Sequence, residues 1–557
     1  MKKLTVLTAL LFSAAMSLSV TGCKKDPVEP PVDNSLKAVQ VDPYTLGSNY
    51  RNLRIKGYGY SGEQFTEHKQ KVTVDGEAKT ATTYVIEDVK ALVIPVDFTD
   101  APYTLYGESE ESTRAELEKV FFGGPEDMQW YSLKEYYASS SFGKCNITGT
   151  VGPWWHTGVD WQSLPSTTEN GKKVYNNAYS QTLAIQIQDY YRAHPNEINL
   201  SEYDANKDGF IDSLIMIYTA PIRTTGDLFW AFCWNVPGAW GKYNTSGNLE
   251  GVNRFFWASY RFLYERKNRQ NGEEEQYTSE EIKAGVDIHG NPIYPDAHTM
   301  THEYGHVLSL PDYYITDYDA ADYGAMGGLD MMDYNVGDHN AYSKMMYGWI
   351  NPRRITGLEG SITLTLNSTT TTGDTIIIPA PGEWNNTYLD QYLVIEFLTP
   401  DGVAKQDGEE RYLGHYPLYY NQPGIRILHI DSRMGLYQSS GSGESAGYKF
   451  VGYTWTTSTD LSQAYVRVAA DNTKSKSCFP KYKLAEVLPS DGRSIKAHNS
   501  EADTQCLYFE GDGFGENGVW ENYKLNGISG EKDKDFGFKI HVDKINGKES
   551  ATITISR

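Results

Sequence analysis

The sequence predicts an α+β fold in which a mixed central domain, residues 89–352, is followed by a β-rich, sandwich-like region, residues 353–557. Two observations lead to this prediction. In the central part, short apolar runs typical of buried strands alternate with helical patterns. After Pro352, strand patterns follow one another between Gly, Asn and Asp turns, and helical patterns are scarce.

The central domain contains strand and helix patterns in alternation. Ala91–Asp97 and Asp212–Tyr218 are apolar runs of strand length, and Arg254–Phe262 is interpreted as an edge strand. Three segments place apolar residues at helical spacing, and they are Ser112–Phe122, Ser132–Tyr137 and Gln181–Arg192. In the C-terminal region the expected strands are Ser361–Leu366, Asp374–Ile378, Tyr392–Phe397, Gly424–Ile430 and Ala551–Ile555.

The N-terminus has the pattern of an export signal. Two lysines precede a mostly apolar stretch, Leu4–Val20, and small residues then lead to Cys23. This resembles a bacterial lipoprotein signal at 1–22, which implies cleavage before Cys23 and acylation of its thiol. The alternative is an ordinary secretory signal with an incidental cysteine. Either way we expect export, and the lipid would anchor the protein in the cell envelope, at the outer membrane or cell surface.

Two segments separate the signal from the central domain. Residues 23–35 are a Pro-rich, charged tether. Residues 36–88 are polar, with one predicted strand at Thr82–Ile86, and their role is left open between a propeptide and an extra sheet layer. No later stretch reaches the ~20 apolar residues that span a bilayer, so membrane attachment is expected through the lipid on Cys23.

Charge and cysteine content exclude some partners and sites. The net charge of −22 and the lack of a Lys/Arg-rich stripe argue against a nucleic-acid partner. The four later cysteines form no CxxC pair, so a thiolate metal site is not expected. Cys145 with Cys233 and Cys478 with Cys506 are candidate disulfides, and free buried thiols are the alternative. The sequence does not indicate an oligomeric state.

The segment HEYGH carries the chemistry that is easiest to recognise. A helix is expected from Ala297 to Leu310, capped by Asp296 and stopped by Pro311. His302 and His306 are four residues apart, so they share one helix face and can offer ring nitrogens to one zinc ion. Glu303 beside them is placed to take a proton from water.

A third zinc ligand is needed. His298 lies two turns before His306, about 12 Å away along the helix, which is too far to share the ion. Among later residues, Glu359 sits in a glycine-flanked turn and is poorly placed. Asp312 follows the break at Pro311 and is the better candidate for the third ligand, with one position left open for water.

HEYGHVLSLPDYY resembles the extended zinc motif of the immune-inhibitor-A family of secreted metallopeptidases, which are metzincin-like. The resemblance implies a metzincin-like fold, zinc held by His302, His306 and Asp312, and Glu303 as general base. The family pattern HExxHxxGxxD has glycine where this chain has Ser309. A glycine there suits a positive φ, at which another residue costs about 1–2 kcal/mol.

The segment GGLDMMDY, residues 327–334, resembles the Met-turn of that family, a tight loop whose methionine packs beneath the zinc. The resemblance implies that Met332 is this methionine. Tyr334 stands where some metzincins place a tyrosine that reaches the metal or stabilises the oxyanion. The alternative for Tyr334 is a packing role.

Two further motifs lie outside the zinc segment. DANKDGFID places Asp204, Asn206, Asp208, the Phe210 carbonyl and Asp212 like the front of a calcium loop, but it lacks the last bidentate Glu. The alternative is an Asp-Gly turn that leads into a strand. GESAG around Ser445 matches the esterase elbow GxSxG, although its flanks do not have the required strand–turn–helix pattern.

The sequence therefore predicts a lipid-anchored zinc endopeptidase that hydrolyses peptide bonds of extracellular proteins. Zinc is the expected cofactor, calcium is a second candidate, and a protein or peptide is the substrate. One alternative is a catalytically silent surface-binding lipoprotein on the same fold, which Ser309 favours. A remote alternative is a serine esterase that uses Ser445.

Overall fold

The computed structural model describes residues 33–46, 64–74, 76–224, 226–236, 251–267, 274–316, 323–440, 447–453, 464–473, 483–527 and 532–557. The chain divides into two compact units, 1–34 and 35–557, and the fold described below is that of the second. The expected signal, Cys23 and nearly all of the tether lie outside the described residues. Among the helices that are described, none combines the length and the apolar character needed to cross a membrane.

The first sheet has the strand order β10-β11-β9-β4-β5, with β6 also paired to β4. Its pairs are parallel except for β10, which is antiparallel to β11. Both predicted buried strands are confirmed. The edge-strand prediction for the run at 254 is wrong, because β11 is buried along its whole length and lies between β9 and β10. The strands are β4 (Asp88–Asp97), β5 (Asn146–Val151), β6 (Trp155–His156), β9 (Ser213–Tyr218), β10 (Phe232–Asn235) and β11 (Arg254–Ser259).

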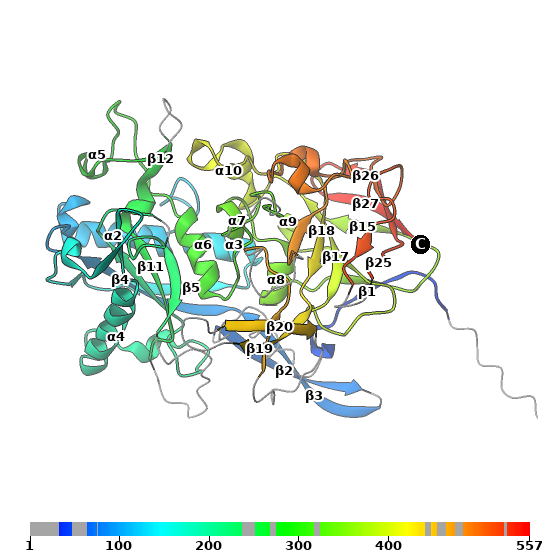
Figure 1. The fold of residues 1–557 in the computed structure, drawn as a ribbon, viewed down its shortest axis with the longest axis horizontal. Helices are drawn as coiled ribbons and strands as arrows, with labels where there is room; N and C mark the ends of the chain where they lie inside the picture. The colour runs from blue at the N-terminus through cyan, green and yellow to red at the C-terminus, as the bar shows by residue number, and fades with distance from the viewer. Residues whose placement is uncertain are drawn as a thin grey trace, which may run out of the picture. The chain divides into compact units, whose positions relative to one another are not determined.

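Helices cover both faces of this sheet. Alternate residues of β4 show the division. Ala91 and Val93 belong to one core with helices α2, α3 and α6 (His298–Val307), and Leu92 and Ile94 belong to another with α4. The three predicted helices are confirmed, each extended by a few residues. They are α2 (Glu110–Phe122), α3 (Leu133–Ser140) and α4 (Ala178–Ala193), and Figure 1 shows α4 apart from the other two.

A sandwich of two sheets forms the β-rich region, as predicted. The sheets have the orders β1-β14-β16-β17-β18-β22 and β15-β27-β26-β23, and their inner faces share one apolar core. The outer face of β16, β17 and β18 contributes Ile377, Val394 and Leu428 to the core that also holds α6. The strands are β14 (Arg353–Thr356), β15 (Ser361–Asn367), β16 (Thr375–Pro379), β17 (Gln391–Leu398), β18 (Gly424–Asp431), β22 (Ala485–Val487), β23 (Gly513–Phe514), β26 (Lys539–Asn546) and β27 (Ser550–Ser556).

The region before β4 is tied to both parts. Strand β1 (Lys37–Gln40) pairs with β14 at one end of the sandwich sheet. Strands β2 (Phe65–Val74) and β3 (Glu77–Ile86) form a hairpin that includes the predicted strand and leads directly into β4. The Ile86 carbonyl accepts a hydrogen bond from the Trp349 indole, which follows helix α8 (Ala341–Tyr347). These contacts join the described residues of this region to both parts of the fold.

Candidate metal centre

The candidate metal centre is built on α6 (His298–Val307), all ten residues of which are buried. Helix α6 contacts β11 on one side and the short helix α7 (Met331–Tyr334) on the other (Figure 1). The Asp296 carboxylate accepts a hydrogen bond from the His298 backbone N–H at 2.9 Å, but the N-cap residue is Ala297, which makes no side-chain capping bond, so the prediction of Asp296 as the cap is wrong by one residue. His302 and His306 lie together, with ring centroids 4.9 Å apart.

The helix ends three residues earlier than predicted. Ser309 has φ 81°, and its N–H donates to the His306 carbonyl at 2.9 Å. The Leu310 N–H donates to the Gly305 carbonyl, also at 2.9 Å. This pair of bonds is a Schellman motif, in which a left-handed residue ends the helix. The prediction that Pro311 stops the helix is therefore wrong, because the chain has already turned at Ser309.

This turn brings Asp312 to the two histidines. Asp312 Oδ1 lies 3.1 Å from His302 Nε2 and 3.0 Å from His306 Nε2. Within the part of the chain that the structure describes, these residues are the one group of three His, Cys, Asp or Glu side chains whose ligand atoms come within 4.8 Å of one another. We call them the metal trio.

The opposite ring nitrogen of each histidine contacts a backbone carbonyl. His302 Nδ1 lies 2.7 Å from the Met331 oxygen, and His306 Nδ1 lies 2.8 Å from the Leu310 oxygen. A carbonyl only accepts, so each Nδ1 carries a proton, which leaves Nε2 as the ring atom that can ligate a metal on the side of Asp312. Metal-ligating histidines are held in this way.

The electrostatics of the trio favour a cation. Burial opposes a charge on His306, but the charge and hydrogen bond of Asp312 outweigh it and raise the pKa of His306 to about 9. Burial likewise opposes the charge of Asp312, yet the two histidines hold the pKa of its carboxyl well below its usual range. A metal ion at this point would take the place of the proton.

Glu303 completes the centre. Its side chain is buried, and among the described residues its Oε2 has no hydrogen-bond partner. Burial raises the pKa of Glu303, while the charges of His306 and His302 act in the opposite direction. Two imidazoles and one carboxylate are a ligand set that suits zinc, and a buried acid oxygen without a partner fits a water or substrate group beside it. These residues therefore fit a zinc ion.

The loop with the predicted Met-turn lies directly against α6. The Asp330 carboxylate caps α7 by accepting from the Met332 N–H at 2.9 Å. The sulfur of Met332 lies where a Cβ on Gly305 would stand, so the glycine of HEYGH makes room for it. The Met332 carbonyl accepts from the Tyr313 N–H at 2.7 Å. The structure thus places Met332 against α6 and links its loop to the segment that carries Asp312.

Two tyrosines differ in where the structure places them. The ring of Tyr334 packs against Gly328 and Tyr416. Tyr314, which the sequence analysis missed, has its ring centroid 6.0 Å from that of His302. Burial, and then the charges of Asp312 and Glu303, raise the pKa of its hydroxyl well above its usual range. The signal was the second tyrosine of PDYY, two residues after Asp312.

The candidate calcium residues form a compact loop before β9. Asp204 accepts from the backbone N–H groups of Asp208 and Gly209, and Asp208 accepts from that of Phe210. Asp212 accepts from the N–H of Ala205 and of Lys90. Gly209 at the predicted turn has φ 92°. Asn206 accepts a bond from the Asp208 N–H as well. The structure places these residues in one loop, but the carboxylate oxygens of Asp204, Asp208 and Asp212 do not all lie within 4.8 Å of one another, and calcium binding stays a prediction.

Two other sequence motifs have different outcomes. Ser445 lies outside the described residues. Cys145, Cys233 and Cys506 are free thiols in the structure, so the proposed pairing of Cys145 with Cys233 is wrong, and Cys506 has no disulfide partner among the described residues. Cys145 and Cys506 are buried, and Cys233 is half-buried. Cys478 lies outside the described residues.

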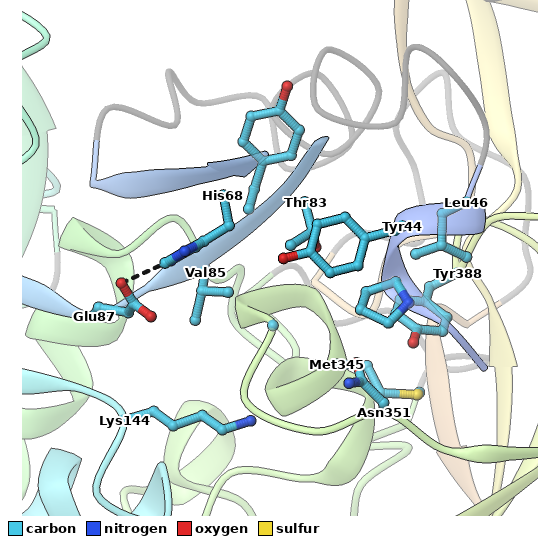
Figure 2. A pocket seen from close by; sticks show the side chains of 13 residues that line it. Tyr44, Leu46, His68, Thr83, Val85, Glu87, Lys144, Met345, Asn351 and Tyr388 are labelled. Carbon is cyan, nitrogen blue, oxygen red and sulfur yellow. Dashed lines mark hydrogen bonds and ion pairs between the residues drawn. The ribbon is translucent and has the colours of Figure 1, made fainter. Parts of the chain in front are cut away.

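A cavity of about 250 Å³ lies under the N-terminal layer, between β3 and α8. Figure 2 shows His68 paired with Glu87 at one side and Tyr44 and Tyr388 at the other. Lys144 also borders it, with its ammonium directed at the Trp349 carbonyl. The residues that line this cavity do not include the metal trio or Glu303, so it is a feature separate from the metal centre.

The comparisons with known proteins give a distant metalloprotease relationship. No protein-family model matches the chain. It is 25% identical over 265 residues to the pre-pro-metalloprotease PrtV of two Vibrio cholerae O1 strains, M66-2 and El Tor Inaba N16961. The match covers 41% of this chain and 25% of those relatives, so the chain spans about a quarter of their length. This similarity suggests a distant relationship to a metalloprotease.

Proposed function

We propose that the chain is a zinc-dependent endopeptidase with a metzincin-like catalytic centre. The observation that carries this proposal is the convergence of His302 Nε2 and His306 Nε2 on Asp312 Oδ1, beside the buried carboxylate of Glu303. The distant similarity to a metalloprotease supports it. The substrate class is a protein or peptide.

The metal trio would hold the zinc ion, and Glu303 would act as the general base. A bound zinc ion supplies Lewis-acid chemistry, which polarises a carbonyl and makes water a stronger acid. The carbonyls of Met331 and Leu310 keep the two imidazoles in the tautomer that ligates. Glu303 would accept the proton of the attacking water at its carboxylate and return it to the nitrogen of the leaving amine.

The test is Glu303→Gln, which keeps size and polarity but removes the base. We expect the variant to bind one zinc per chain, as the wild type does, and to cleave casein at least 10³-fold more slowly, within the range that proton transfer and nucleophile activation contribute. The matched control is Glu359→Gln, the same change at an exposed site, with wild-type activity expected. Equal turnover by Glu303→Gln and wild type would overturn the assignment.

Two alternatives have their own outcomes in this experiment. A wild-type protein that holds zinc and cleaves no protein would indicate a surface-binding protein on a peptidase fold. Activity that survives a chelator, together with fluorophosphonate labelling of Ser445, would indicate the esterase.

We also propose that the protein is exported and lipid-anchored at Cys23, in the cell envelope. Radiolabelled palmitate should enter the wild-type protein and be lost in Cys23→Ala, and the variant should leave the membrane fraction. Incorporation that is equal in both proteins would contradict the anchor.

A further inference from the structure

Arg426 and Glu396 form a buried ion pair on one sheet of the sandwich. They lie opposite each other on β18 and β17, with Arg426 Nε 2.7 Å from Glu396 Oε2, and their side chains are 1% and 2% exposed. Side chains alternate between the two faces of a strand, so the pair shares a face with Val394 and Leu428. These two residues belong to the core that also holds α6. The pair therefore faces the side of the sheet on which the metal centre is built.

Both members of the pair bond to the ends of one loop, residues 329–341, which we call the Met332 loop. Glu396 Oε1 accepts from the Ala341 N–H at 2.8 Å, where α8 begins. The Arg426 guanidinium donates to the Leu329 carbonyl at 3.4 Å. These bonds are compatible with the ion pair, because a carboxylate accepts on two oxygens and a guanidinium offers five donors. The pair thus holds the loop at its first and last residues.

The Met332 loop is also closed across its base. The Asp330 carboxylate accepts from the Met332 N–H at 2.9 Å. It accepts as well from the backbone N–H and the side-chain amide of Asn340, at 2.9 and 2.8 Å. Since these bonds tie the two ends of the loop together, a displacement of either end should carry the residues between them along.

The Met332 loop reaches the metal trio through two of its carbonyls. The Met331 oxygen lies 2.7 Å from His302 Nδ1. The Met332 oxygen accepts from the N–H of Tyr313, the neighbour of Asp312, at 2.7 Å. Outer hydrogen bonds of this kind orient metal ligands, and their loss typically weakens metal binding by about 10–100-fold. The position of the loop should therefore affect the affinity of the site.

We propose that Arg426 and Glu396 are positioning residues for the metal centre: they hold the Met332 loop, whose Met331 carbonyl orients His302. Stability alone does not account for a buried ion pair, because its desolvation cost can exceed the attraction between its charges. This inference rests on the proposed zinc site and adds to it two residues of the β-rich region that the zinc motif does not include.

The test is Arg426→Met/Glu396→Met, which removes both charges together and leaves neither unpaired. We expect its zinc dissociation constant, measured by competition with a fluorescent chelator, to rise by about tenfold or more. The matched control is Arg433→Met/Asp431→Met. It removes another buried arginine–carboxylate pair, 2.6 Å apart at the end of β18, where Asp431 accepts from Asn526. The zinc affinity of the control should stay within about twofold of the wild-type value.

A second readout separates positioning from a general loss of stability. Cobalt(II) bound in place of zinc has a visible spectrum that depends on ligand geometry. We expect this spectrum to change in Arg426→Met/Glu396→Met and to stay as in the wild type in the control. A pair with a structural role alone would lower the melting temperature of the metal-free protein and leave the cobalt spectrum unchanged, which would contradict the inference.

If the double variant does not fold, Arg426→Lys decides the question. Lysine keeps a positive charge beside Glu396 but lacks the planar fork that also reaches Leu329, so the zinc dissociation constant should still rise. An unchanged value in Arg426→Lys, or a value within about twofold of wild type in the folded double variant, would overturn the inference. The proposed function would stand in that case if Glu303→Gln bound zinc and were inactive. Failure of the wild type itself to bind zinc would overturn both.

Discussion

The guanidinium of Arg254 donates to the hydroxyl oxygen of Ser309 at 3.1 Å, at the point where helix α6 ends. The same nitrogen donates to the carbonyls of His306 and Val307 at 2.9 and 2.8 Å. A buried cation from β11 thus satisfies the last carbonyls of α6, where a positive charge is also favoured by the helix dipole. This contact shows how the chain accommodates a serine at φ 81° in the turn that leads to Asp312.

Substitution at Ser309 should separate backbone strain from the hydrogen bond. Ser309→Gly and Ser309→Ala both lose the bond to Arg254, but only glycine also relieves the left-handed backbone. We expect the glycine variant to be more stable than the alanine variant by about 1 kcal/mol, from denaturant unfolding. Equal stability of the two variants would mean that the turn carries no strain.

Removal of the Arg254 side chain should have a larger effect. Arg254→Met leaves two buried carbonyls and the Ser309 hydroxyl without this donor, so we expect a loss of about 3 kcal/mol in the free energy of unfolding. Zinc affinity should fall too, because the turn before Asp312 loses its support. The comparison is Arg493→Met, where an exposed arginine pairs with Asp491 and little change is expected.

The Gly305→Ala variant should disturb the contact between α6 and Met332. A Cβ at this position would collide with the Met332 sulfur, so Met332 or the helix must shift. We expect a loss of about 1–3 kcal/mol in unfolding free energy and weaker zinc binding, since the Met331 carbonyl holds His302. In a Met332→Ala background, Gly305→Ala should lower the free energy of unfolding by less than it does in the wild type. Additive effects would contradict the contact.

The buried His298 should make the free energy of unfolding depend on pH. Burial between Trp130 and Tyr412 opposes its charge, but Asp296 and Asp407 outweigh burial and raise the pKa of His298 to about 9. The protonated His298 stabilises the fold fully at pH values below its unfolded-state pKa of about 6.5. This contribution is lost as the pH rises through the folded-state pKa of about 9. Relative to His298→Gln, it should amount to about 3 kcal/mol at low pH. A stability difference that does not change between pH 6 and 10 would exclude the charged form.

Calcium should stabilise the protein if the loop at 204–212 binds it. Calcium at about 100 times its dissociation constant would add about 2.7 kcal/mol, measured as a rise in melting temperature. Burial raises the pKa of Asp212 well above its usual range, and the charges of Asp208 and Asp204 raise it further. A bound cation would therefore relieve the repulsion between these carboxylates. The variant Asp204→Asn/Asp208→Asn should lose the response. An equal response in the variant would place calcium elsewhere.

Much of the secondary structure was predictable from the sequence because it depends on local pattern. The apolar runs at 91–97 and 212–218 became β4 and β9, and the five C-terminal strands appear within two residues of their predicted bounds. The edge assignment of β11 failed because periodicity reports how buried a strand is, and not which strands flank it. The early end of α6 was missed because it depends on Ser309 and on a distant arginine.

The sequence by itself determined the pair of histidines on one helix face and the acid between them, because a spacing of four residues in a helix is a local property. It also pointed to Asp312, and to a glycine-type turn at Ser309. Only the tertiary structure decided that Arg254 supports that turn and that Met332 packs against Gly305. These contacts join segments brought together by the sheets and the sandwich, and spacing along the chain carries no record of them.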